Sequence, residues 1–118
     1  MKYLYCTAMI CLCSPVSLAA DVTIALPGSS PVERNYVSYK CQGGLQLKVE
    51  YINAGPNSLA VVPVSGSVLV FANVMSGSGA RYAAGPYIWW TKGTGAELYD
   101  QRQGGGSKPI ACTEVGSP

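Results

Sequence analysis

The sequence contains no histidine, and this absence excludes several kinds of catalytic site. A Ser-His-Asp or Cys-His arrangement needs an imidazole base. A structural zinc site needs four ligands, which the two cysteines beyond residue 20 cannot supply. The six acidic residues show no spacing that marks two of them as the paired carboxylates of a glycosidase. We therefore expect a protein that is not an enzyme and that uses no metal and no cofactor.

Charged residues are also scarce, at 12% of the chain. Beyond Lys2 there are seven basic and six acidic residues, and no basic run stands out. This balance disfavours nucleic acid and anionic membrane surfaces as partners. The glycine-rich stretch 92–95 lacks the spacing of a phosphate-binding loop, and no helix follows it. The expected function is therefore binding through a surface, without nucleic acid.

No hydrophobic run is long enough to cross a membrane. The longest, Tyr3–Cys13, is far shorter than the roughly 20 apolar residues that a bilayer requires. It follows Lys2 and precedes small residues that end at Ala20, which is the layout of a secretory signal peptide. We predict a signal peptide over residues 1–20, with cleavage after Ala20 or, as an alternative, after Ala19, and export to the periplasm without membrane insertion.

A bacterial lipid anchor on Cys11 or Cys13 is the less favoured alternative. Such anchors follow a small residue, whereas Ile10 and Leu12 precede these cysteines. Export leaves Cys41 and Cys112 in an oxidising compartment, so we predict a disulfide between them. On the chain-entropy view, closing so long a loop contributes about 4 kcal/mol.

The remaining chain shows no sustained helical period and reads as all-β. Residues 45–51 alternate strictly, so Leu45, Leu47, Val49 and Tyr51 are expected on one face of a strand. Further strands are expected at 36–42, 59–64, 67–74, 87–91, 96–99 and 109–114, with glycine-rich turns such as Gly43-Gly44 between them. This pattern predicts a small antiparallel β-barrel or sandwich, preceded by a loosely attached arm over residues 21–35.

Two turns carry unusual residues. The first is Ser76-Gly-Ser-Gly-Ala-Arg-Tyr82, and the second is Trp89-Trp-Thr-Lys-Gly93. From the residues alone, the first could be an ordinary glycine hairpin and Lys92 an ordinary solvated lysine. Consecutive strand residues face opposite sides, so at least one of the two tryptophans should pack inside.

These blocks stand in an order that resembles a known family. Tyr39-Lys-Cys41, Leu59-Ala-Val-Val62, Ser78-Gly-Ala-Arg-Tyr82, Tyr87-Ile-Trp-Trp-Thr-Lys-Gly93, Ala96-Glu-Leu-Tyr99 and Cys112 are together similar to the MliC/PliC family, the bacterial inhibitors of c-type lysozyme. The resemblance runs from about Tyr36 to Cys112, and without a convincing lipid-attachment cysteine the chain looks like the soluble periplasmic branch.

The resemblance implies a barrel of about eight strands over residues 36–118, with the disulfide Cys41–Cys112. It also implies that the loop around Ser78 enters the active-site cleft of a c-type lysozyme and that Lys92 takes part beside it. For the lysozyme-binding surface we expect Gly77, Ser78, Gly79, Arg81, Tyr82, Thr91 and Lys92. Both loops must then lie at one end of the barrel, which requires a chain reversal at residues 83–86.

Two alternatives from other classes stay open. The chain could be an envelope module that binds peptidoglycan or another glycan with Trp89 or Trp90 as a stacking platform. It could also be a structural envelope protein without a specific ligand. The sequence leaves open whether the chain forms a homodimer.

Overall fold

The structure is a computed structural model that describes residues 10–13, 21–28, 30–104, 106 and 108–116. The predicted signal peptide and its cleavage site lie largely outside these residues. The described residues form eight strands and two short 3-10 turns: β1 Val32–Cys41, η1 Gln42–Gly44, β2 Gln46–Ala54, β3 Asn57–Val64, β4 Ser67–Val74, β5 Ala80–Ala84, β6 Tyr87–Lys92, β7 Gly95–Asp100, η2 Gln101–Gln103 and β8 Ile110–Glu114. No helix in this part of the chain is long and apolar enough to span a bilayer.

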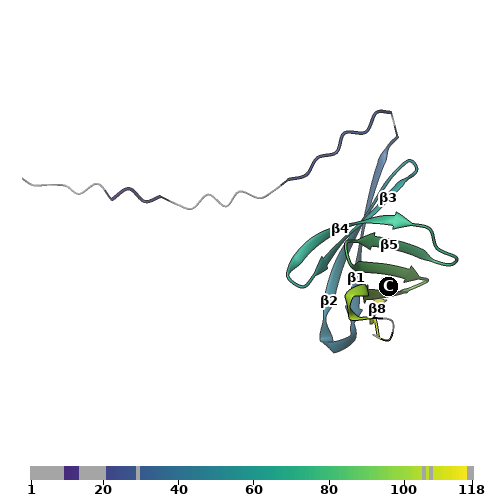
Figure 1. Cartoon of the computed structure of the whole chain (residues 1–118). Coiled ribbons are helices and arrows are strands. Elements are labelled where there is room, and N and C mark those ends of the chain that lie inside the picture. Colours follow the sequence, from purple (N-terminus) through teal and green to yellow (C-terminus); the bar gives the residue numbers. More distant parts are fainter. Residues whose placement is uncertain (1–9, 14–20, 29, 105, 107, 117–118) are drawn as a thin grey trace, which may run out of the picture.

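The strands form a closed antiparallel barrel in which each strand pairs with its neighbours in sequence and β8 returns to β1 (Figure 1). This confirms the all-β prediction and the expected number of strands. Because every connection reverses the chain, the connections alternate between the two ends. The β2–β3, β4–β5 and β6–β7 connections share one end with the C-terminal end of β8, and we call it the Ser78 end.

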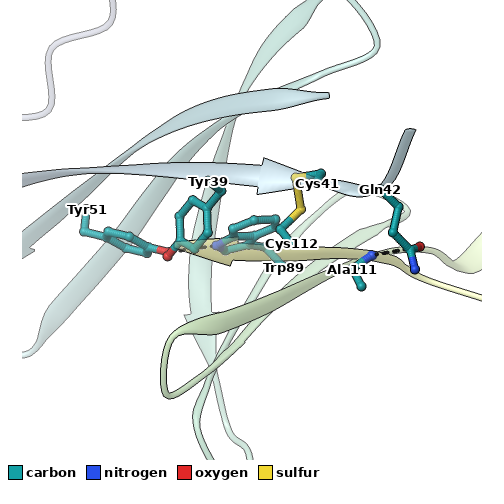
Figure 2. Close-up of a disulfide and its surroundings, with 7 residues drawn as sticks. All are labelled: Tyr39, Cys41, Gln42, Tyr51, Trp89, Ala111 and Cys112. Carbon is teal, nitrogen blue, oxygen red and sulfur yellow. Dashed lines mark hydrogen bonds between the residues drawn. A yellow bond between two sulfur atoms is a disulfide. The ribbon is translucent and has the colours of Figure 1, made fainter. Parts of the chain in front are cut away.

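The alternation of strand residues places one apolar face of each strand inside the barrel. The fully buried large side chains are Trp89, Tyr39, Phe71, Val49 and Val62. One of the two tryptophans is thus internal, as the period of two predicted. Its buried indole N–H donates to the Tyr51 hydroxyl at 2.9 Å, and the Tyr39 and Tyr51 hydroxyls share a 2.7 Å hydrogen bond (Figure 2). The polar groups of these core aromatics are therefore satisfied inside the barrel.

The barrel closes at a short seam between β1 and β8. The register pairs Tyr39 with Glu114, Lys40 with Thr113, and Cys41 with Cys112. The last pair forms the predicted disulfide, across a sequence separation of 71 (Figure 2). The bond reinforces a junction that has few backbone pairs of its own.

Two details differ from the sequence-based expectation. Strand β1 begins at Val32, which pairs with Ala54 of β2. Residues 32–35 therefore belong to the sheet and not to the arm. Leu45 was expected inside with Leu47, but it lies before β2 and is 43% exposed. The reason is local. Gly43 and Gly44 both have positive φ, and Leu45 completes their turn because its carbonyl accepts a hydrogen bond from the Cys41 N–H at 2.7 Å.

Candidate functional site

The first element of the site is the loop over residues 75–79, between β4 and β5. Ser78 is exposed at its tip. The Ser76 hydroxyl donates to the Gly79 carbonyl at 3.2 Å and closes the loop on itself. Gly79 has φ +63°, and a Cβ there would lie 2.1 Å from the Thr91 carbonyl oxygen. Glycine therefore lets this loop lie directly on β6.

The second element is the end of β6 and the turn that follows it. Lys92 is the last residue of β6 and is exposed. A Cβ on Gly79 would lie 2.9 Å from the Lys92 Cγ, so the two elements are in contact. The pairing of Ala80 with Thr91 aligns them, because the chain reverses between β5 and β6 at residues 85–86. The expectation that both loops share one end of the barrel is confirmed.

Trp90 connects the two elements. It lies on the outer face of β6, opposite Arg81 of β5. Its indole N–H donates to the Ser78 carbonyl at 2.9 Å, and the Lys92 Nζ lies 4.3 Å from its ring centroid. The Arg81 guanidinium lies at 5.7 Å from the same centroid. One indole thus fixes the backbone of the loop by a hydrogen bond and holds two cations by cation–π attraction.

The other residues expected at the site have different places. Gly77 is exposed in the loop, and Arg81 is half-buried beside Trp90. The Thr91 hydroxyl donates to the Ala80 carbonyl at 3.3 Å, which joins β5 and β6 beneath the loop. Tyr82 is only 7% exposed and packs in the core against Tyr51. Because so little of its side chain is exposed, we do not expect Tyr82 to contact a partner.

The electrostatics at this end leave the Lys92 ammonium free for an outside partner. Within the described ranges, the ion pairs are Arg34–Glu50 and Arg102–Asp100, and neither involves Lys92. Glu97 of β7, which pairs with Trp90, accepts a hydrogen bond from the Tyr99 hydroxyl, and this bond raises the pKa of Tyr99. A carboxylate brought from outside would therefore meet an ammonium that forms no ion pair among the described residues.

A shallow groove of about 240 Å³ runs from Lys92 along the outer face of β6, β7 and β8. Trp90, Glu97, Tyr99 and Ala111 line it. For the described part of the chain, no three cysteine, aspartate or glutamate side chains gather as a metal site would require. Trp89 is fully buried, so it cannot serve as a stacking platform for a sugar.

The arrangement is suited to binding carboxyl groups. The Ser78 hydroxyl can donate or accept, so it can bind a carboxyl in either protonation state. The Lys92 ammonium offers charged donors to an ionised carboxylate. Lys92 ends β6, and Ser78 lies in the loop before β5, the strand that pairs with β6; Trp90 holds this loop by its hydrogen bond to the Ser78 carbonyl. The role of Trp90 was not predicted from the sequence, because it depends on a strand register that brings residues 78 and 90 together.

Comparison with known proteins gives a consistent result. The family model of MliC, the membrane-bound lysozyme inhibitor of c-type lysozyme, matches residues 39–106. A Pseudomonas aeruginosa protein named membrane-bound lysozyme inhibitor of C-type lysozyme is 55% identical over 93 residues, which are 77% of this chain and 73% of that protein. A Cupriavidus necator protein of the same name is 39% identical over 82 residues, 70% of this chain and 66% of that protein.

A solved structure agrees with these relatives. The crystal structure of Pseudomonas aeruginosa MliC in complex with hen egg white lysozyme aligns with a TM-score of 0.70 and 50% identity, over 82% of this chain and 98% of that chain. Both relatives above are described as membrane-bound. On the extent and identity of these matches, the chain belongs to the MliC family of membrane-bound lysozyme inhibitors of c-type lysozyme.

Proposed function

We propose that this protein inhibits a c-type lysozyme by placing the Ser78 loop and Lys92 in the active-site cleft of that enzyme. A glycosidase cleft of this kind contains a glutamic acid and an aspartate at different protonation states. The exposed Ser78 hydroxyl and the Lys92 ammonium match these two groups in chemistry. As a member of an inhibitor family, the protein contributes no catalysis of its own.

The observation that carries the proposal is the junction of Ser78, Trp90 and Lys92. The 2.9 Å bond from the Trp90 indole to the Ser78 carbonyl orders the loop before any partner arrives. Ordering an interface loop in advance removes part of the entropy cost of association. The 50% identity to a chain crystallised with hen egg white lysozyme supports the same partner class.

The proposed contact surface consists of Gly77, Ser78, Gly79, Arg81, Thr91 and Lys92. Ser78 and Lys92 make the contacts with the carboxyl groups. Gly77 and Gly79 keep the loop narrow, Thr91 supports it from β6, and Arg81 flanks the indole. Since the mature chain is close to neutral, we expect insertion into the cleft to contribute more than long-range attraction, and inhibition to depend only modestly on salt.

A turbidity assay with suspended bacterial cell walls tests the proposal. Near-stoichiometric inhibition of a c-type lysozyme, competitive with substrate, is the expected result. A g-type lysozyme measured alongside shows whether the block depends on the c-type cleft. Sedimentation of the protein with isolated peptidoglycan, together with no inhibition, would instead support the glycan-binding alternative that uses Trp90.

We also propose export to the periplasm with cleavage after Ala20. The apolar segment before it and the poor lipid-attachment context of Cys11 and Cys13 support this placement. Mass spectrometry of the protein from the producing cell decides it. A chain that begins at Asp21 agrees with the proposal, and a chain that begins at a lipid-modified Cys11 or Cys13 contradicts it.

A further inference from the structure

The outer face and free edge of β4 form a feature that the inhibitory site does not use. Strand β4 pairs with β3 along Ser67–Ala72, but its pairing with β5 covers Ala72–Val74 only. Residues 67–71 therefore have no strand partner on the β5 side among the described residues. In Figure 1 the β3–β4 hairpin reaches past the end of β5. Unpaired backbone N–H and C=O groups at such an edge are a template for another strand.

This edge lacks two of the features that usually prevent strand pairing, charged side chains and proline. Residues 51–80 contain no charged side chain, and residues 67–71 contain no proline. Val68 and Val70 are 68% and 57% exposed on the outer face. Exposed, uncharged edge strands of β-branched residues are those that associate.

Another free edge in the barrel, on β1, is protected against the addition of a strand, unlike the β4 edge. Residues 32–37 of β1 pair with β2 only. That edge carries Glu33 and Arg34 and follows Pro31, which are the residue types that block strand addition. The β4 edge has no equivalent protection.

From this contrast we propose that two copies of the protein associate through antiparallel pairing of their β4 strands at residues 67–71. A twofold axis at Leu69 would set Val68 of one copy opposite Val70 of the partner subunit. Such cross-strand pairs of β-branched side chains are favourable. Because residues 51–80 are uncharged, the twofold axis brings no like charges together. The strand thus suits a second copy of itself.

The pairing has a consequence for the inhibitory site. The free edge lies at the end of β4 that is opposite the Ser78 loop. Antiparallel pairing would point the two Ser78 ends away from each other and leave both uncovered. The dimer would then bind two lysozyme molecules at once.

Sedimentation velocity of the mature protein tests this inference, with two valine variants on the two edges. Val70→Lys adds a charge to the proposed interface. Val32→Lys is the matched control, because Val32 is 56% exposed on the protected β1 edge. We expect the parent and Val32→Lys to sediment as dimers and Val70→Lys as a monomer that inhibits lysozyme as well as the parent. If Val70→Lys fails to inhibit and is unfolded, Val68→Lys replaces it.

A monomeric parent, or a Val70→Lys or Val68→Lys variant that remains dimeric, would overturn the inference. So would a Val32→Lys variant that becomes monomeric, because the interface would then lie elsewhere. Amide hydrogen exchange gives an independent readout. Exchange in residues 67–71 should accelerate on dilution of the parent, and concentration-independent exchange there would contradict the pairing.

Discussion

Replacing Trp90 with phenylalanine tests how the inhibitory loop is held in place. Trp90→Phe keeps an aromatic ring beneath the Lys92 ammonium but removes the N–H that donates to the Ser78 carbonyl at 2.9 Å. A hydrogen bond of this kind contributes about 1 kcal/mol net. The weaker cation–π attraction of phenylalanine removes roughly 0.5 kcal/mol more. We expect inhibition to weaken by about tenfold, which corresponds to roughly 1.4 kcal/mol.

The effect should appear mainly in binding. The Ser78 loop is exposed, so water can satisfy its carbonyl when the indole bond is lost. Melting should therefore fall by less than the roughly 4–8 °C that a full 1 kcal/mol loss gives in a domain of this size. Tyr87→Phe is the control, because the Tyr87 hydroxyl contacts Arg102 near the other end of the barrel. That variant should inhibit like the parent.

A double-mutant cycle separates positioning from direct contact. If Trp90 acts by holding Lys92 and the loop, the effects of Trp90→Phe and Lys92→Ala on the inhibition constant should be less than additive. Inhibition constants from the turbidity assay supply all four values. An unchanged inhibition constant for Trp90→Phe would refute the positioning argument, and full additivity with Lys92→Ala would show that Trp90 acts through the Ser78 loop and not through Lys92.

Three further results are expected from the barrel itself. Gly79→Ala should weaken inhibition by more than tenfold in the turbidity assay, because φ is +63° and the new Cβ would lie 2.1 Å from the Thr91 carbonyl oxygen, and inhibition equal to that of the parent would contradict this. Reduction of the Cys41–Cys112 disulfide should lower the free energy of unfolding by about 4 kcal/mol, measured by urea denaturation with and without reductant, and an unchanged midpoint would contradict this. Burial raises the pKa of Tyr39 above its usual value near 10, so the folded state holds this proton more tightly than the unfolded state. The contribution of Tyr39 to stability should therefore be constant below pH about 10 and fall as the pH rises further, and a melting temperature that stays constant above pH 10 would argue against the buried hydroxyl pair.

Much of the fold follows from short-range patterns in the sequence. The alternation at 45–51 and the β-branched runs at 59–64 and 67–74 identify strands that the structure contains. The turn glycines and the two cysteines beyond residue 20 also predict the reversal after β1 and the disulfide correctly. The strands and turns depend on residues that are close together in the sequence. The disulfide is the one pairing that two cysteines allow.

The parts that sequence reasoning missed depend on packing. Residues 32–35 are mostly polar, so no apolar alternation marks them as strand, yet pairing with β2 extends β1 back to Val32. Tyr82 looked like an interface residue by type, but its place on β5 turns the side chain into the core. The link from Trp90 to Ser78 spans 12 residues and depends on the β5–β6 register, which no local pattern specifies.

The central claim is that Lys92 at the Ser78 end contacts a carboxylate of a c-type lysozyme. The most direct test is to measure the inhibition constants of Lys92→Ala and Lys48→Ala side by side. The two lysines are matched, because each ammonium lies over an aromatic ring, Trp90 for Lys92 and Tyr36 for Lys48. Lys92→Ala should weaken inhibition of hen egg white lysozyme by about 10- to 100-fold, roughly 1.4–2.8 kcal/mol, and Lys48→Ala should leave it unchanged. Equal inhibition by both variants and the parent would contradict the account.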